Sequence, residues 1–350
     1  MRAPLVYKDE PLFGFDLGTR TAKMIQLRPT GKAMEVLGYG YATFPAGTIV
    51  EGIIVDPQEI AEALRPLLKQ MSYGHITARR VITGLPVAKT FTRELELPPM
   101  DPADLDAAVR LEAEQYVPVP LPDLYIDYEV IERQDEHIQV LMIAAPRAIV
   151  DSYIKLFELM SLEVAFIESS LTAVTRALLP SGKSDKVTLI ADMGSESIDL
   201  AIKDKVVRLT DTIALGGDSI TTQLMKDLGI THDQANEIKF KYGIAASGLQ
   251  PKIKESLMTT LETICSEMKR VIKYYTDRSK DNRAVEQIIL AGGSASMPGL
   301  VDFLSEHLGA PTSIADPWAG LELKHIQAVS KLEAPMYTTA IGLARLEGEL

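Results

Sequence analysis

The sequence has little cysteine, tryptophan, histidine or positive charge. Of its 350 residues, one is cysteine, one is tryptophan and five are histidine, and 48 acidic residues outnumber 36 basic ones for a net charge of −12. The single Cys265 excludes an internal disulfide and a cysteine-based metal site, and no two histidines have the spacing of a ligand pair. Because proteins hold nucleic acid largely through Lys and Arg on phosphates, the acidic balance argues against a nucleic-acid partner.

Long apolar runs are also lacking. No run approaches the ~20 apolar residues that a membrane span needs, and residues 1–11 lack the apolar core of a signal peptide. Residues 344–350 are acidic and do not resemble an amphipathic membrane anchor. We therefore expect a cytoplasmic protein with no direct membrane insertion. A chain of 350 residues exceeds what one core supports, so we expect two domains of roughly 150 residues.

One motif, D-[LM]-G-[ST]-x-[ST], occurs twice at domain-sized separation, in residues 13–23 and 189–199. Each copy predicts a strand, a tight turn and a second strand. The glycine lets the backbone approach a ligand, and the N–H groups and hydroxyls that follow suit phosphate oxygens. The carboxylates Asp16 and Asp192 would act through a hydrated Mg²⁺. A single copy is commonly an ordinary β-turn, but the duplication favours two hairpins that clamp a triphosphate.

Other segments outline the remaining organisation. Residues 11–83 predict a β-β-β-α-β order, and residues 84–166 predict a separate α/β insert with three strands and two helices. Helices are expected over 167–179, 231–242 and 251–278. A late strand ends in Gly292-Gly293 before another helix, which is a second place where backbone donors could meet a ligand. The P-loop and dinucleotide glycine patterns are both missing.

The two hairpins and the late Gly-Gly turn resemble the actin, hexokinase and heat-shock-chaperone superfamily. In that superfamily, two related β-β-β-α-β-α domains face each other across a nucleotide cleft. The bacterial relatives usually carry A-E-x-x-K where this chain has Ala235-Asn236-Glu237-Ile238-Lys239, so Lys239 is in place while Asn236 stands at the Glu position. The resemblance implies water-mediated Mg²⁺ binding by Asp16 and Asp192. It implies phosphate contacts from Gly18, Thr19, Arg20, Lys23, Gly194, Ser195 and Glu196, and nucleoside contacts from Gly217, Asn236, Lys239, Gly292, Gly293, Ser294 and Met297.

A more specific resemblance lies in the insert and its surroundings. Residues 97–100, 111–118, 127–128, 145–147 and 316–318 are similar to the PilM family of type IV pilus assembly proteins, over about residues 11–346. The chain also resembles the cell-division protein FtsA of the same superfamily, which has the same kind of insert but normally ends in an amphipathic membrane helix. The fold implied is an actin-like two-domain α/β fold with an FtsA-like insert. Its expected units are a first domain (11–83, 167–188 and 330–350), an insert (84–166), a second domain (189–217 and 284–329) and a helical subdomain (218–283).

The resemblance implies a cytoplasmic protein that binds ATP or ADP with Mg²⁺ and is held at the inner membrane by its partner. That partner is the N-terminal tail of the membrane protein PilN, gripped between the first domain and the insert. Extended peptides bind through apolar pockets and strand-like hydrogen bonds. We expect this groove near Leu95, Leu97, Val109, Ala113 and Tyr116. For Leu95, Leu97 and Val109, packing inside the insert is the alternative, because apolar residues at strand or helix spacing usually pack.

Catalysis has no assignable residue, because hydrolysis needs a group that positions the attacking water and no side chain can be given that role from the sequence. A nucleotide-dependent scaffold or switch is therefore favoured, with weak hydrolysis or none. The alternatives are an FtsA-like cell-division or cytoskeletal actin homologue and a slow ATPase or sugar kinase of the same superfamily. Self-association is a further expectation, by analogy with actin-like filaments.

Overall fold

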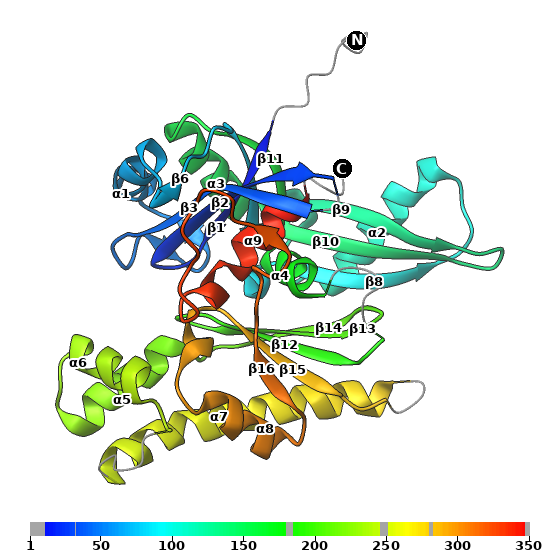
Figure 1. The fold of residues 1–350 in the computed structure, drawn as a ribbon. Coiled ribbons are helices and arrows are strands. Elements are labelled where there is room, and N and C mark those ends of the chain that lie inside the picture. Colours follow the sequence, from blue (N-terminus) through cyan, green and yellow to red (C-terminus); the bar gives the residue numbers. More distant parts are fainter. Residues whose placement is uncertain (1–10, 32, 180–184, 246–250, 280–282, 347–350) are drawn as a thin grey trace.

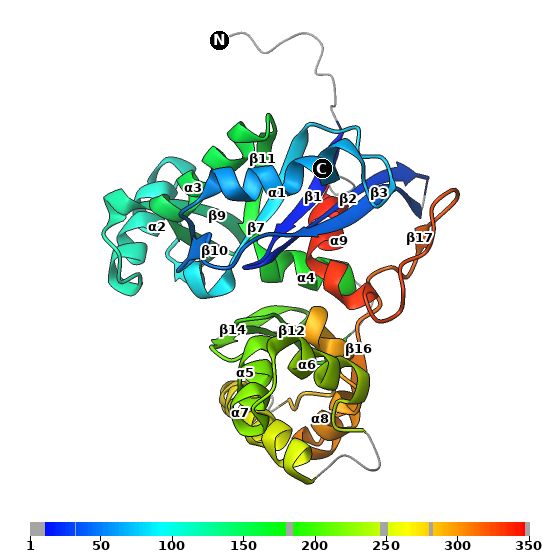
Figure 2. The ribbon, with the colours of Figure 1, turned by 90° about the vertical axis from the view of Figure 1, so that its left-hand side faces the viewer.

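The computed structural model describes residues 11–31, 33–179, 185–245, 251–279 and 283–346, and the chain forms two stacked halves (Figures 1 and 2). The first half comprises β1 to α4 together with β17 and α9. The second half comprises β12 to β16 with helices α5 to α8. Each half is built on its own central sheet. Within the described residues, no helix is both long enough and apolar enough to cross a membrane.

The first half has a mixed sheet with the strand order β11-β7-β1-β2-β3-β17. Helices α1 (Pro57–Lys69) and α3 (Arg147–Leu159) bury one face around Phe13 and Phe15, and helices α4 (Ser170–Leu178) and α9 (Thr338–Arg345) lie on the other. The strands are β1 (Leu12–Leu17), β2 (Thr21–Thr30), β3 (Ala33–Thr43), β7 (Arg80–Leu85), β11 (Glu163–Ser169) and β17 (Leu321–Glu322), with β6 (Tyr73–Gly74) beside β3 and a small hairpin of β4 (Ile49–Val50) and β5 (Ile53–Ile54).

The insert projects sideways from the first half (Figure 1). It has a three-stranded antiparallel sheet in the order β8-β10-β9, from β8 (Phe91–Leu97), β9 (Leu124–Arg133) and β10 (Ile138–Pro146). Helix α2 (Pro102–Tyr116) packs on this sheet through Leu105, Val109 and Ala113. Strand β8 is an edge strand, because β10 is its neighbour on one side alone.

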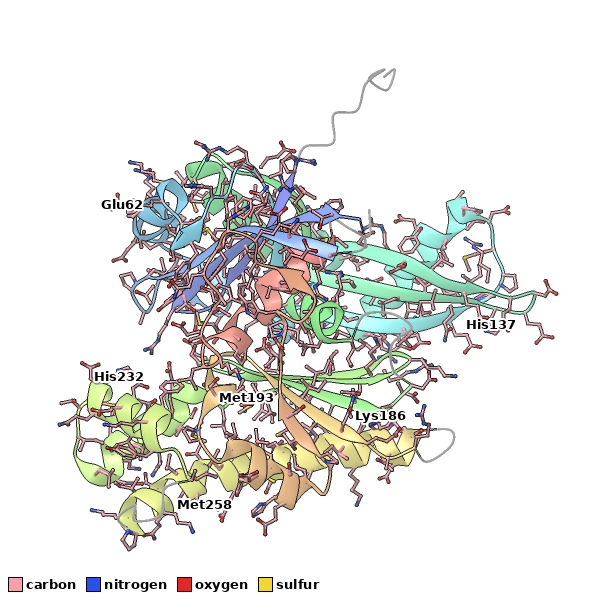
Figure 3. The ribbon with its side chains drawn as sticks, viewed as in Figure 1. Glu62, His137, Lys186, Met193, His232 and Met258 are labelled. Carbon is pink, nitrogen blue, oxygen red and sulfur yellow. The ribbon has the colours of Figure 1, made fainter. Side chains whose placement is uncertain are left out.

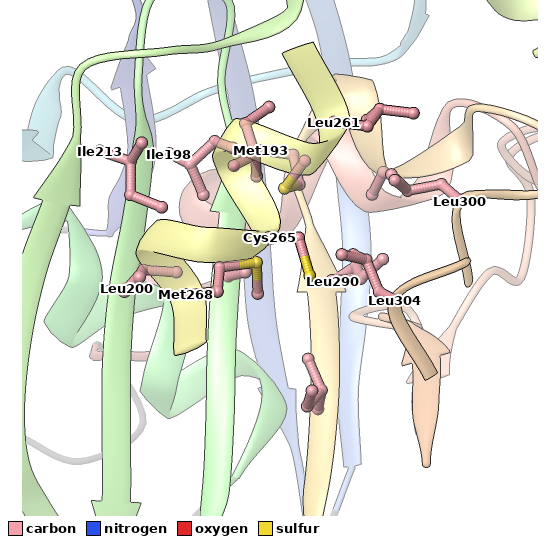
Figure 4. Close-up of a cluster of buried hydrophobic side chains, with 14 of the residues drawn as sticks. Met193, Ile198, Leu200, Ile213, Leu261, Cys265, Met268, Leu290, Leu300 and Leu304 are labelled. Atoms are coloured by element: carbon pink, nitrogen blue, oxygen red, sulfur yellow. The ribbon is translucent and has the colours of Figure 1, made fainter. Parts of the chain in front are cut away.

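The second half has a sheet in the order β14-β13-β12-β15-β16, and the long helix α7 (Pro251–Arg278) crosses one face of it. Met193, Leu261 and Leu290 meet in its core beside Cys265 (Figure 4). The elements are β12 (Thr188–Met193), β13 (Ile198–Asp204), β14 (Val206–Ile213), β15 (Gln287–Ala291), β16 (Thr312–Ile314), α5 (Gly217–Leu228), α6 (His232–Glu237) and α8 (Leu300–Leu308).

The two sheets repeat one topology. Strand β1 pairs antiparallel with β2 and parallel with β7, and β12 pairs antiparallel with β13 and parallel with β15. The duplicated motif therefore forms two equivalent hairpins, as the sequence predicts. Two helix predictions need correction. Residues 163–169 form β11 beside β7, so helix α4 begins at Ser170 rather than at 167. The expected helix over 231–242 becomes α6 followed by a π-helical turn, Ile238–Tyr242.

Candidate functional site

The turns of the two hairpins face each other where the halves meet. The hydroxyl oxygens Thr19 Oγ1 and Ser195 Oγ lie 2.9 Å apart, within hydrogen-bonding distance. Met193, at the end of β12, lies on the side of the second half nearest the first half (Figure 3). The fold thus brings together two groups that the sequence predicts to bind phosphate from separate copies of one motif.

The acidic residue of the first hairpin is paired with a lysine. The Asp16 carboxylate accepts a hydrogen bond from Lys23 Nζ at 3.0 Å, and both side chains are about 15% exposed. The two residues are direct cross-strand neighbours in the β1–β2 register. Lys23 is therefore held at the base of the turn, where it neutralises Asp16 and leaves its remaining donors for a nearby anion.

The second hairpin places two acidic residues in the same register. Asp192 lies opposite Asp199 in the β12–β13 register. Asp199 therefore occupies the position that Lys23 holds in the first hairpin. Desolvation, followed by the negative charges of Asp199 and Asp16, raises the pKa of Asp192 to about 7. Desolvation also raises the pKa of Asp199 to about 6, although Thr212 donates to it at 2.8 Å. Asp199 is a candidate site residue that the sequence analysis missed, and aligning the two motif copies would have found it.

These carboxyls fit a hydrated divalent cation. Their ionised forms are costly where they lie, so a nearby positive charge would stabilise them. Mg²⁺ commonly keeps several waters and takes one or two carboxylates. Among the residues that the structure describes, no three His, Cys, Asp or Glu side chains lie close enough together to hold a metal ion directly. Two of the histidines, His137 and His232, lie at opposite ends of the molecule (Figure 3).

Helix α5 begins beside the second hairpin and meets a buried lysine. The Gly217 N–H donates to Gly194 O at 2.9 Å, and Lys239 Nζ donates to Gly217 O at 3.1 Å and to Thr221 Oγ1 at 2.9 Å. A Cβ at Gly217 would lie 2.3 Å from Ser294 Oγ. Burial lowers the pKa of Lys239 to about 8, and the nearby Asp218 partly offsets the effect. Gly217, Lys239 and Ser294 thus converge, and a side chain at position 217 would displace the Ser294 hydroxyl.

The other expected nucleoside residues surround this cluster. Asn236 Oδ1 accepts from Thr221 Oγ1 at 3.1 Å, which places it beside Lys239. Gly292 has a φ of +81°, and a Cβ there would lie 2.5 Å from Asp192 Oδ1. Gly293 faces open space, because a Cβ there would meet no atom within 4 Å. Met297 is 2% exposed and packs in the core of the second half, behind the turn rather than on its surface. Glu196 is exposed at the tip of the second hairpin.

The expected peptide groove needs correction. Leu95, Leu97, Val109 and Ala113 are at most 5% exposed and form the core between α2 and the insert sheet, so they cannot line an open groove. Tyr116 is 45% exposed, and the guanidinium of Arg93 lies 3.5 Å from the centre of its ring.

Tyr116 lines a cavity of about 510 Å³. Its wall includes Phe91 and Arg93 of β8 and Thr210 and Thr212 of β14, and both strands are at the edges of their sheets. This cavity, called here the edge-strand cavity, has the backbone groups that an extended chain can pair with.

Two sheets of the same topology, with their hairpins facing one another, define the fold class of this protein. The fold is the actin-like fold: a structure of MreB5 from Spiroplasma citri bound to AMPPNP superimposes with a TM-score of 0.57 at 12% identity, covering 98% of this chain and 97% of that one. A structure described as a PilM-PilN type IV pilus biogenesis complex superimposes with a TM-score of 0.85 at 22% identity, covering 96% and 98%. The cell division protein FtsA of Enterococcus hirae is 24% identical over 345 residues, covering 87% of this chain and 78% of its own length.

The family follows from the sequence match. The profile of the type IV pilus assembly protein PilM family matches residues 14–347, nearly the whole chain. The chain belongs to this family, and it is an actin-like protein of type IV pilus assembly.

Proposed function

We propose that this chain is a nucleotide-dependent scaffold of the pilus assembly platform, which binds ATP or ADP with Mg²⁺ between its two hairpins and the PilN tail beside its insert. The observation that carries the proposal is the 2.9 Å approach of Thr19 to Ser195, because it brings both motif copies to one place. The MreB5 structure, which shares this fold, is bound to AMPPNP, and this supports a nucleotide ligand for the present chain.

The proposed roles follow from the charges of the residues around the two hairpins. Asp16 and Asp192 would hold the hydration shell of Mg²⁺, and Asp199 would add negative charge beside them. Mg²⁺ would supply a positive charge that neutralises the phosphates. Thr19, Ser195 and the backbone of their turns would donate to phosphate oxygens, with Arg20 and Lys23 adding charge. Lys239 and Asn236 would meet the nucleoside from the side of α6.

The partner proposal rests on the edge-strand cavity and on the solved PilM-PilN complex, which shares this fold. An extended PilN tail would pair with a free strand edge and place an apolar side chain against Tyr116 and Phe91. The chain would then lie on the cytoplasmic face of the inner membrane, held there through PilN. Leu95, Leu97, Val109 and Ala113 would support this surface from the core beneath it.

Calorimetric titration with ATP·Mg²⁺ tests the nucleotide site. The wild type should bind, and Asp16→Asn should weaken binding by at least about tenfold, because it removes a charge that attracts Mg²⁺. Asp135→Asn, an exposed change in the β9–β10 turn, is the matched control and should bind like the wild type. If the wild type does not bind ATP·Mg²⁺, the nucleotide proposal is wrong and the protein is a passive adaptor.

Titration with a synthetic peptide of the PilN N-terminus tests the partner site. Tyr116→Ala should weaken binding about fivefold or more, since exposed aromatic anchors carry much of a peptide's binding energy. Tyr125→Ala is the control, because Tyr125 is similarly exposed and also carries an arginine, Arg147, over its ring. Equal losses in both variants would contradict the placement. If nucleotide and peptide are coupled, each must change the affinity of the other by the same factor.

A further inference from the structure

One ion pair joins the first hairpin to the first turn of α5. Arg20 follows Thr19 in the turn of the first hairpin, and its Nη2 lies 3.0 Å from Asp218 Oδ2. The backbone N–H of Asp218 donates to Ser195 O at 2.8 Å, so Asp218 is fixed against the second hairpin. The pair therefore spans the two halves directly beside the Thr19–Ser195 contact.

The pair is incompletely bonded. Within the described part of the chain, both Arg20 Nε and Asp218 Oδ2 are buried atoms that have no hydrogen-bond partner. The 3.0 Å contact is close enough for charge attraction but lacks the geometry of a hydrogen bond. A guanidinium binds a carboxylate or phosphate best through two parallel N–H groups. Asp218 thus occupies Arg20 without using its Nε donor, and a buried unsatisfied donor is costly.

The surrounding charges favour a change of partner. Arg20 and Lys239 are both close enough to Asp218 to interact electrostatically with it. A polyphosphate beside these groups would be attracted by two cations and repelled by one carboxylate. Its oxygens could accept from both Nε and Nη2 of Arg20, which Asp218 does not do.

We propose that Asp218 sets the nucleotide affinity of this site by competing with a phosphate group for Arg20. Phosphate binding exchanges the carboxylate for a phosphate oxygen on the guanidinium, and no covalent bond changes. The link between the halves then runs through the nucleotide instead of through Asp218. This inference rests on the proposed nucleotide site and adds Asp218 to it as an affinity-determining residue that opposes binding.

Asp218→Asn tests the inference, because it removes the competing charge with little change in shape. The variant should bind ATP·Mg²⁺ or ADP·Mg²⁺ roughly three- to tenfold more tightly than the wild type, as expected for the loss of one partly exposed ion pair. Asp233→Asn makes the same charge change at a fully exposed position on α6 and should leave the affinity unchanged. The gain should be smaller at high salt, which screens exposed charges.

A double-mutant cycle with Arg20→Gln separates competition from other effects. If Asp218 acts chiefly through Arg20, Asp218→Asn should strengthen binding far less in the Arg20→Gln background than in the wild type. Weaker or unchanged binding by Asp218→Asn, with thermal unfolding like the wild type, would overturn the inference and leave the nucleotide site standing. A wild type that binds no nucleotide would instead remove the proposed function and the inference together.

Discussion

Lys239 is a cation held out of water next to the start of α5. It is 3% exposed, and its ammonium group is held by Gly217 O and Thr221 Oγ1. It lies in the π-helical turn that follows α6, and such turns are frequent at functional sites. Because burial disfavours the charged form, its pKa is lowered to about 8. A lysine in this setting contributes to stability in a pH-dependent way.

The stability of the wild type relative to Lys239→Met should rise with pH. The unfolded chain keeps this proton up to a pKa of 10.5, whereas the folded chain releases it near 8, so the unfolded state binds more protons between these values. Stability therefore increases across that window, by on the order of 2 kcal/mol relative to the variant. Urea unfolding of both proteins near pH 7 and pH 10 measures the difference. Lys241→Met, at an exposed lysine whose pKa is raised, should show no such rise.

At the residue scale, the sequence predicted the phosphate turns because their chemistry is local: glycine, hydroxyl and carboxylate lie within six residues. It missed Asp199, which stands out only when the two motif copies are aligned and Asp199 falls at the position of Lys23. It also could not decide whether Leu95 and Val109 face a partner or the chain itself. The spacing of apolar residues shows which side of a strand or helix is buried, but it does not show what covers that side.

Helix α9 packs unusually close to its neighbours because small residues line its contact faces. A Cβ at Gly342 would lie 1.8 Å from Ala173 O of α4, and a Cβ at Gly14 of β1 would lie 2.1 Å from Ala340 O of α9. Both added atoms would collide with backbone, which cannot move aside as a side chain can. Glycine at these two positions therefore sets the distance between the sheet and the helices that face the second half.

Gly342→Ala should destabilise the protein, against the usual preference of helices. Alanine normally stabilises a helix by about 1 kcal/mol relative to glycine, but here the methyl group would force α9 away from α4. We expect a net loss of about 2 kcal/mol or more, measured by chemical denaturation. Gly293→Ala, whose new Cβ meets no atom within 4 Å, should change stability far less. A stabilised Gly342→Ala variant would show that α9 can shift freely.

At the element scale, the sequence predicted β8 and α7 well because apolar residues recur in them at strand or helix spacing. It failed at β11, where a strand over 163–169 leads directly into α4 with no turn residue between them. Pairing with β7 stabilises this strand, and that pairing joins segments far apart in the chain. Long-range pairing of this kind overrides local preference.

The halves meet through a small apolar cluster as well as through the hairpins. Leu171 and Val174 of α4 pack against Ile190 of β12 and Ala201 of β13, and all four are nearly inaccessible to solvent. Each half also has a larger core of its own. The two halves, each with its own core, are therefore joined by a thin apolar seam, and the polar contacts lie beside it.

Val174→Asp should separate the unfolding of the two halves. A carboxylate at this fully buried position has no cation to pair with in the cluster, so we expect a loss of at least about 3 kcal/mol. Calorimetry should show a lower melting temperature and two resolved transitions. Val55→Asp makes the same change at a position that is 56% exposed and should unfold like the wild type. An unchanged single transition in Val174→Asp would contradict the role given to the seam.

At the scale of the whole molecule, the duplicated motif predicted that two units face each other. It did not predict which side chains meet between them. The Arg20–Asp218 contact depends on the distance between a hairpin and a helix from different halves. No local pattern encodes that distance, because it is set by the seam and by the glycines under α9.

Because the chain has one tryptophan and one cysteine, these two residues can report separately on the unfolding of the two halves. Trp318 is 9% exposed and packs between Tyr39 and Tyr337 in the first half, so its fluorescence should follow the melting of that half alone. Cys265 is 3% exposed in the core of the second half, so a thiol reagent can reach it only when that half opens. An optical signal and a chemical one thus report separately on the two halves, and neither needs an engineered label.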